Sequence, residues 1–203
     1  MFTIGIDPAQ SGASCLVWSN NECKEALCVV SWKPRTRNKK KVYELTITNT
    51  SNMGTHHASV IVEDASEIGA TIARIAVDRM KEFPNDTTVQ VCCEDAYFGK
   101  SAKTSIIVAR FAGLISGACI ATFTANLIQT EQIQWVKAAS WRNKLLKLSH
   151  WTKREKAKKA SLEYVPLLIT SINEHLQQQG KLDHITDATG VALWSIKQAE
   201  NNQ

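Results

Sequence analysis

Hydrophobic positions in the first quarter of the chain follow one another or alternate with polar ones, a pattern typical of β-strands. Pro8 ends the first of these segments, since proline cannot donate to a strand ladder. Gly12 marks the next turn, and the short Asn20-Asn21 turn predicts that the segments on either side pair antiparallel. The predicted strands are residues 2–7, 13–18, 25–32 and 42–48, followed by a polar loop at 49–59.

From residue 65 onward the hydrophobic positions recur every three or four residues, which is typical of helices. Ile68, Ile72 and Ile75 show this spacing, and Pro84 follows the end of the segment. The predicted helices are residues 65–83, 101–123 with Ser101 as N-cap, 139–148, 152–164 and 185–198, with strands at 87–93 and 132–137. Three early antiparallel strands followed by alternating helices and strands predict an α/β domain. Its mixed central sheet would contain these three strands and parallel ones, flanked by helices.

Length and composition are typical of one folded domain. The chain has 203 residues, of which 44% are hydrophobic and 21% charged, and it contains no repeat or linker. We recognise no secretory signal and no apolar run near the roughly 20 residues that a membrane helix needs. These features predict a soluble intracellular protein with no membrane partner. The six cysteines lack metal-ligand spacing, so we expect them to be reduced core residues.

Positive charge is concentrated in two segments. The formal net charge is +5, but residues 33–41 hold six basic residues and no acid, and residues 137–159 hold nine against the single acid Glu155. Together they carry 15 of the 24 lysine and arginine residues. The first segment lies between two predicted strands, so it forms the tip of a hairpin. Such runs are either solvated faces or polyanion-binding surfaces, and the clustering favours nucleic acid.

Three acidic residues lie where a sheet protein commonly places functional groups. Asp7 and Glu94 each end a predicted strand, and Asp187 lies in the first turn of the last predicted helix. Each has an ordinary explanation alone: a turn residue before proline, a solvated strand end and a partner of the helix dipole. Together, three carboxylates at one sheet edge repel one another unless a cation neutralises them, and oxygen ligands favour Mg²⁺ or Mn²⁺.

Three motifs, in this order, resemble RuvC-type Holliday junction resolvases, which are members of the ribonuclease H-like nuclease superfamily. Residues 4–8 (Ile-Gly-Ile-Asp-Pro) are similar to the family's opening strand, and residues 93–98 (Cys-Glu-Asp-Ala-Tyr-Phe) to its second acidic motif. Residues 182–188 (Leu-Asp-His-Ile-Thr-Asp-Ala) resemble its closing motif. The resemblance spans nearly the whole chain and implies a single RuvC-like nuclease domain, residues 1–203, with the ribonuclease H-like fold.

The resemblance also implies an activity, the resolution of Holliday junctions, which are four-way branched DNA, by paired phosphodiester hydrolysis. Two Mg²⁺ (or Mn²⁺) ions about 3.5–4 Å apart would clamp the scissile phosphate. The implied catalytic and metal-binding residues are Asp7, Glu94, His184 and Asp187. His184 matches the family's acid-or-His position, three residues before Asp187. Asp183 is the alternative fourth ligand, because both side chains lie near Asp187 on a helix.

Several residues are candidates for binding DNA. Tyr97 and Phe98 either stack on an unpaired base or pack in the core. Lys100 and Lys103 begin the long helix next to the second acidic motif. Basic residues cover several faces of a later helix, as expected for phosphate contacts: Lys153, Arg154, Lys156, Lys158 and Lys159. Four tryptophans are expected in the core: Trp135, Trp141, Trp151 and Trp194.

The resemblance implies a homodimer, to which the long helix at 101–123 contributes. Gly113 and Gly117 lie on one face of this helix, where close approach of another backbone compensates for their low helix propensity. That backbone belongs either to a second copy of the chain or to the protein's own sheet. The basic hairpin at 33–41 and the polar loop at 49–59 are insertions relative to compact bacterial members, and Ala9 replaces the family's usual glycine. These departures indicate a viral or phage member, which would act in the host cytoplasm.

Two other functions remain open. One is a ribonuclease H-like nuclease that acts on an RNA–DNA hybrid or on RNA. The other is a catalytically inactive nucleic-acid-binding module that keeps the fold, against which the intact set of Asp7, Glu94 and Asp187 argues. Cleavage of synthetic four-way, three-way and linear DNA with and without Mg²⁺ separates these possibilities.

Overall fold

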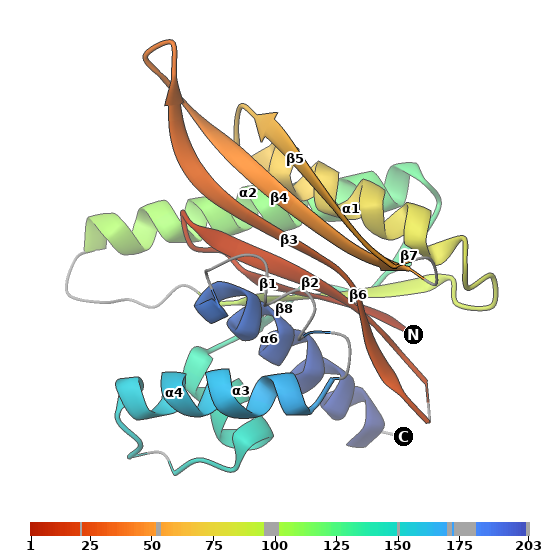
Figure 1. Ribbon diagram of the computed structural model, residues 1–203, viewed down its shortest axis with the longest axis vertical. Helices are drawn as coiled ribbons and strands as arrows, with labels where there is room; N and C mark the ends of the chain where they lie inside the picture. The colour runs from red at the N-terminus through yellow and green to blue at the C-terminus, as the bar shows by residue number, and fades with distance from the viewer. Residues whose placement is uncertain are drawn as a thin grey trace.

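The strand-forming segments pair into one mixed β-sheet in this computed structural model, which describes residues 1–20, 22–51, 54–95, 102–149, 151–169, 172 and 182–201 (Figure 1). The strands are β1 (Phe2–Asp7), β2 (Gly12–Ser19), β3 (Lys24–Arg37), β4 (Lys40–Ser51), β5 (Gly54–Val62), β6 (Thr88–Glu94), β7 (Gln129–Thr130) and β8 (Gln134–Val136). Their order is β5-β4-β3-β2-β1-β6-β7, and β8 also pairs with β6.

The directions of the strands determine which ends lie together. Strand β2 is antiparallel to both β1 and β3, and β6 is parallel to β1. The carboxyl-terminal ends of β1, β3 and β6 therefore lie at the same edge of the sheet. Asp7 and Glu94 are the last residues of β1 and β6, so the chain brings both carboxylates to this edge.

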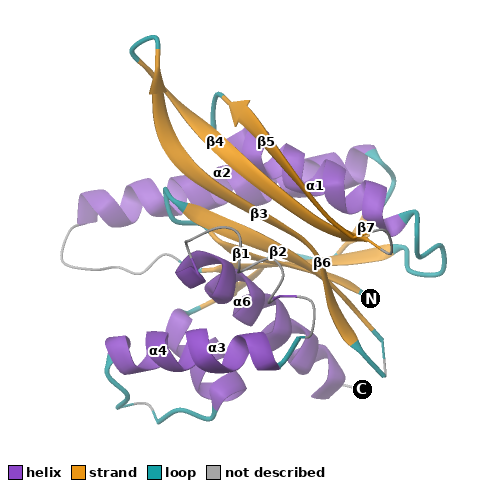
Figure 2. Ribbon diagram, in the orientation of Figure 1, coloured by secondary structure: helices purple, strands orange, loops and turns teal. Residues whose placement is uncertain are grey.

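Helices cover both faces of the sheet (Figure 2). They are α1 (Ala65–Met80), α2 (Ala102–Ala125), α3 (Ala138–Leu146), α4 (Arg154–Tyr164), a 3₁₀ turn (Val165–Leu167) and α6 (Leu182–Asn201). Helices α1 and α2 pack together on one face, whereas α6, with α3 and α4 beside it, covers the other. This arrangement confirms the predicted α/β architecture with a mixed sheet.

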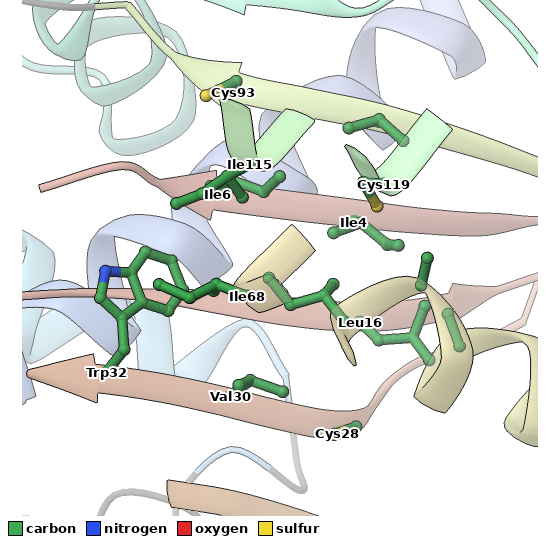
Figure 3. Close-up of a cluster of buried hydrophobic side chains, with 14 of the residues drawn as sticks. Ile4, Ile6, Leu16, Cys28, Val30, Trp32, Ile68, Cys93, Ile115 and Cys119 are labelled. Carbon is green, nitrogen blue, oxygen red and sulfur yellow. The ribbon is translucent and has the colours of Figure 1, made fainter. Parts of the chain in front are cut away.

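Alternation along β1 assigns its side chains to the two layers. Ile4 and Ile6 point toward α1 and α2, where they pack near Ile68 and Ile115 in a fully buried core (Figure 3). Successive residues of a strand point to opposite faces, so Gly5 and Asp7 face α6.

Gly5 allows α6 to lie directly on β1. A Cβ atom at this position would lie 2.0 Å from the backbone oxygen of Ala188 and 2.6 Å from the amide nitrogen of Ala192. No side chain fits there, so glycine is required for the close approach of helix and strand. This contact brings the amino-terminal half of α6 to the edge that carries Asp7.

Helix α2 has the length and composition of a membrane span. This corrects the expectation that the chain has no such segment. The helix packs against α1 and the sheet through Phe111, Ile115 and Phe123, which are all buried. A Cβ on Gly69 of α1 would lie 2.0 Å from the backbone oxygen of Ile115. In this structure α2 is therefore a helix of the folded core.

The opposite face of α2 is exposed and apolar. Ile106 and Leu114 are 54% and 53% exposed. Gly113 and Gly117 are also exposed, and a Cβ added to either would meet nothing within 4 Å. The alternative that these glycines pack on the protein's own sheet is therefore wrong, because that face of the helix points away from the sheet.

Several expectations need correction. The segment 49–59, expected to be a polar loop, is instead the end of β4, up to Ser51, and most of β5, from Gly54. Strand β5 pairs with β4 although most of its described side chains are exposed on this edge strand. Strand β7 was not predicted, and its two residues give no periodic signal. Trp135 and Trp151 are 47% and 92% exposed, so they are not core residues, whereas Trp141 is buried. Trp194, on α6, is partly buried against the core.

The remaining residue expectations of the core hold with one exception. Five of the six cysteines are buried and free, as expected, but Cys23 is exposed. The expected N-cap Ser101 lies outside the described residues, as do Tyr97, Phe98 and Lys100.

Candidate active site at the sheet edge

Asp7 and Glu94 lie side by side at the carboxyl-terminal edge. Strands β1 and β6 are paired in parallel register up to Ile6 and Cys93, so the next residue of each strand carries a carboxylate. Asp7 is buried, with 8% of its surface exposed. Two carboxylates held this close by backbone pairing raise the electrostatic cost of ionising both.

Helix α6 adds His184 and Asp187 to the same edge. Nδ1 of His184 lies 2.5 Å from Oδ2 of Asp7. Asp187 is 6% exposed and forms an ion pair with Arg142, whose Nη2 lies 2.7 Å from Oδ1 of the carboxylate. Because α6 begins at Leu182, Asp187 lies in the second turn of the helix and not in the first as expected.

Asp183 points elsewhere, although it is next to His184 in sequence. It is exposed, and its Oδ2 lies 3.3 Å from Nζ of Lys158. His184 lines the pocket that contains Asp7, Glu94 and Asp187, whereas Asp183 does not. The rotation of α6 on β1 thus distinguishes two residues that sequence geometry left equivalent.

Two residues of α3 complete the site and were missed by the sequence analysis. Trp141 is fully buried, and its Nε1 donates a hydrogen bond of 2.9 Å to Oε2 of Glu94. The guanidinium of Arg142 stacks 4.8 Å from the Trp141 ring centroid, and its Nε is buried without a hydrogen-bond partner. Arg142 was counted only as one charge in the basic run, because spacing alone does not show that one of nine cations points inward.

The electrostatics of the site favour protonated groups. Burial, together with the nearby charges of Asp7 and Asp187, raises the pKa of Glu94 to about 7. Burial also raises the pKa of Asp187, and Arg142 opposes that shift. The hydrogen bond to Asp7 raises the pKa of His184. Burial is the main cause for the two carboxyl groups, and the charge of Asp7 adds to all three shifts, so the site favours bound protons or other cations.

A pocket of about 460 Å³ opens over these groups. The acidic set, His184 and Arg142 line it together with Arg154 and Lys158 of α4. Pockets of this size with convergent polar groups and shifted pKa values are typical of active sites. The basic side chains at its rim would attract an anionic substrate such as a phosphodiester.

The donor types suit a divalent metal ion, but their present arrangement does not form a cage. Carboxylate oxygens with one imidazole nitrogen are common ligands of Mg²⁺ and Mn²⁺. Within the described part of the chain, however, no three histidine, cysteine, aspartate or glutamate side chains are grouped closely enough to hold an ion. In this arrangement Asp187 pairs with Arg142, and Asp7 contacts His184.

The candidate DNA-binding residues that the structure describes lie on the surface. Lys103 is exposed near the start of α2. On α4 and at its N-cap, four basic residues are exposed and Lys158 is half-buried; the exposed ones are Lys153, Arg154, Lys156 and Lys159. Arg154 and Lys158 reach the pocket, whereas Lys159 lies 3.8 Å from Glu163 in a surface pair. These placements agree with a basic surface beside the acidic site.

Comparison with known proteins identifies the fold. No protein-family model matches the chain, and no curated protein sequence matches it. Among solved structures, Thermus thermophilus RuvC is 15% identical with a TM-score of 0.53, covering 100% of this chain and 97% of its own. The same protein in complex with a Holliday junction substrate gives the same identity and TM-score and is covered to 96%. The yeast mitochondrial Holliday junction resolvase Ydc2 is 12% identical, with a TM-score of 0.46 and coverages of 98% and 80%.

The match to RuvC runs along the full length of both chains, although the sequence identity is low. It therefore covers the mixed sheet and the helices on both of its faces. The chain therefore has the ribonuclease H-like α/β fold in the form found in RuvC.

Proposed function

We propose that this protein is a metal-dependent, structure-selective endonuclease that resolves four-way branched DNA by paired phosphodiester hydrolysis. The observation that supports it best is the convergence of Asp7, Glu94, His184 and Asp187 from two strands and one helix in a single pocket. The whole chain, residues 1–203, would act as one nuclease domain. We place it in the cytoplasm, or in the host cytoplasm if the source is a virus.

In this mechanism Asp7, Glu94, Asp187 and His184 would hold two Mg²⁺ or Mn²⁺ ions. Bound ions of this type lower the pKa of water and neutralise charge on the attacking and leaving oxygens. The paired strands β1 and β6 fix the backbone positions of Asp7 and Glu94 at one edge of the sheet. Trp141 orients Glu94 through its hydrogen bond. Without metal, the hydrogen bond to Asp7 raises the pKa of His184 and so favours its protonated form.

DNA would lie over the pocket and along α4. The exposed lysines and arginine of this helix point to solvent beside the acidic groups, where they can contact phosphates without reading sequence. Selectivity for a four-way branch would then depend on shape and on the relative positions of two active sites.

A homodimer would supply those two sites, and the exposed face of α2 is its proposed interface. Ile106, Leu114, Gly113 and Gly117 give an apolar surface with space for a second backbone. Small residues four apart on a helix allow two helices to pack closely.

Cleavage of labelled DNA tests the proposal. We expect paired nicks in four-way DNA in Mg²⁺, little cleavage of linear duplex, and none in a chelator. Asp7→Asn should abolish cleavage and leave junction binding in chelator intact. Asp183→Asn, the same change at the exposed carboxylate, is the matched control and should cut normally. Preferential cleavage of an RNA–DNA hybrid, or no cleavage of any substrate, would overturn the proposal.

A further inference from the structure

Strands β3 and β4 extend past the sheet as a two-stranded ribbon. Trp32 on β3 and Val42 on β4 are the buried residues nearest the tip, and residues 34–41 between them are all exposed. Figure 1 shows this hairpin, orange at the top of the view, projecting beyond the rest of the molecule. The sequence predicted the hairpin, but the structure extends its strands to Arg37 and Lys40, so the turn is only two residues long.

The charges on the ribbon are placed unfavourably for an isolated protein. Arg37 and Lys40 are directly opposite each other in the strand pairing, and like charges in such positions destabilise a hairpin. Glu44 pairs with both Lys33 and Arg35 nearer the sheet. Within the described residues, no ion pair involves Arg37, Lys39 or Lys40. The tip therefore carries cations that the protein itself does not neutralise.

The turn residue Lys39 adds to this cost. Asn38 and Lys39 have φ angles of 50° and 62°, and two-residue hairpin turns of this type favour Asn followed by Gly. Asn38 suits its position, whereas a lysine in the left-handed region is strained by its Cβ. The chain thus has a cation at the outermost point of the hairpin where glycine would be more stable. An anionic partner would compensate for both unfavourable features.

The base of the hairpin is fixed next to the candidate active site. Nε1 of Trp32 donates a hydrogen bond of 2.9 Å to the backbone oxygen of Ala9, two residues after Asp7. Nζ of Lys41 lies 3.2 Å from Oε1 of Gln10 in the same loop. Strand β3 also runs in the same direction as β1, so the hairpin leaves the sheet from the edge that carries Asp7.

We propose that the hairpin tip, residues 37–40, binds the phosphate backbone of a duplex DNA arm, and that this arm is not the one lying along α4. The β3–β4 tip and α4 lie at opposite ends of the long axis of the molecule (Figure 1), so one short duplex at the pocket would not contact both. A two-stranded ribbon is narrow enough to enter the major groove. The inference rests on the proposed function for its branched substrate.

Binding measured in chelator tests the inference without requiring cleavage. The test variant is Arg37→Gln, Lys39→Gly, Lys40→Gln, and the control is Lys24→Gln, Arg74→Gln, Lys81→Gln, which removes the same charge away from the hairpin. The affinity of the wild type and of both variants is measured for two four-way junctions, one with arms of about three helical turns and one with arms of about one turn. We expect the test variant to bind long arms more weakly than the wild type and to differ much less on short ones. On long arms, the slope of log affinity against log salt concentration should be shallower by about 0.9 for each phosphate that the variant no longer binds.

The outcomes separate this inference from the proposed function. Wild-type affinity in the test variant, or an equal loss in the control, would overturn the hairpin as a DNA contact. An equal loss on long and short arms would overturn the assignment to a separate arm. If the test variant behaves as expected but the wild type cuts no DNA, the proposed function fails and the hairpin contact remains. A melting temperature at or above that of the wild type shows that the test variant is folded, since each residue altered in it is exposed.

Discussion

Arg142 and Asp187 are both buried at the sheet edge and lie 2.7 Å apart, whereas Arg37 and Lys40 are exposed at the hairpin tip and face each other with the same sign. At the edge, the buried charge of Asp187 has a cationic partner inside the protein. At the tip, Arg37 and Lys40 have no ion pair within the described residues, so a bound anion would compensate their charges. We therefore expect the edge to carry out the proposed chemistry and the tip to supply affinity for DNA, and each prediction tests one of these two expectations.

The largest effect on stability is expected at Arg142. Removing one member of a buried ion pair leaves the other charge uncompensated, which typically costs about 3–5 kcal/mol. Arg142→Met should therefore lower the free energy of unfolding by an amount of this order, measured by urea denaturation in chelator. Arg142→Lys, which keeps the charge, should be less destabilised. Addition of Mg²⁺ should raise the melting temperature of Arg142→Met more than that of the wild type, because Mg²⁺ can then replace the missing guanidinium beside Asp187. An equal rise would contradict the proposal that Arg142 neutralises Asp187.

His184 should matter for cleavage and Asp183 should not. A proton-holding group beside Asp7 contributes about 100-fold or more to a hydrolytic rate, so His184→Ala should slow cleavage by about that factor. Asp183→Ala removes only an exposed contact with Lys158 and should leave the rate near that of the wild type. Single-turnover cleavage rates are measured for both variants, and the melting temperature of each variant shows whether it is folded. A slow Asp183→Ala beside a normal His184→Ala would reverse the assignment.

Stability without metal should fall as pH rises. Glu94, Asp187 and His184 all have raised pKa values in the folded protein, so the folded site binds more protons than the unfolded chain. Their favourable contribution is present at low pH and is lost as pH rises through the folded-state values, about 7 for Glu94. We expect a loss on the order of 2 kcal/mol between pH 5 and 8. Glu94→Gln should flatten this dependence, and an unchanged pH profile in that variant would contradict the role of Glu94.

The smallest effect is expected at the hairpin and has the opposite sign. Lys39→Gly relieves a left-handed lysine and removes one of several like charges, so it should stabilise the free protein by about 1 kcal/mol. Junction affinity should fall at the same time. Thermal unfolding and DNA titration of the same preparation check both. A variant that is less stable than the wild type would show that the tip is not strained by Lys39.

Much of the fold could be predicted because its signals are local. Asp7 and Glu94 end strands whose hydrophobic pattern is clear, and parallel pairing brings such ends together. Strand β5 was missed because most of its side chains are exposed, so no burial pattern marks it. Trp151 was misplaced because a large apolar side chain is usually buried, but 92% of its surface is exposed here.

The site was only partly predictable, because its details depend on how one helix is rotated. The choice between His184 and Asp183 is made by the packing of α6 on β1, which no local pattern records. Arg142 lies on the buried face of α3, within a basic run that resembles a DNA-binding surface. Arg142 points inward because Trp141 beside it is buried and because Asp187, on α6, forms an ion pair with it.

The contact between Gly5 and Ala188 also sets the alignment of the acidic site. Two residues along a strand advance about 6.6 Å, and four residues along a helix advance about 6 Å. The distance from Gly5 to Asp7 along β1 is therefore about equal to the distance from Ala188 back to His184 along α6. Because Gly5 and Ala188 are in contact, Asp7 and His184 lie opposite each other as well. A methyl group at residue 5 would push α6 outward and separate His184 from Asp7. Gly5, the one glycine of this strand, thus permits the close approach that keeps the carboxylate of Asp7 and the imidazole of His184 within hydrogen-bond distance.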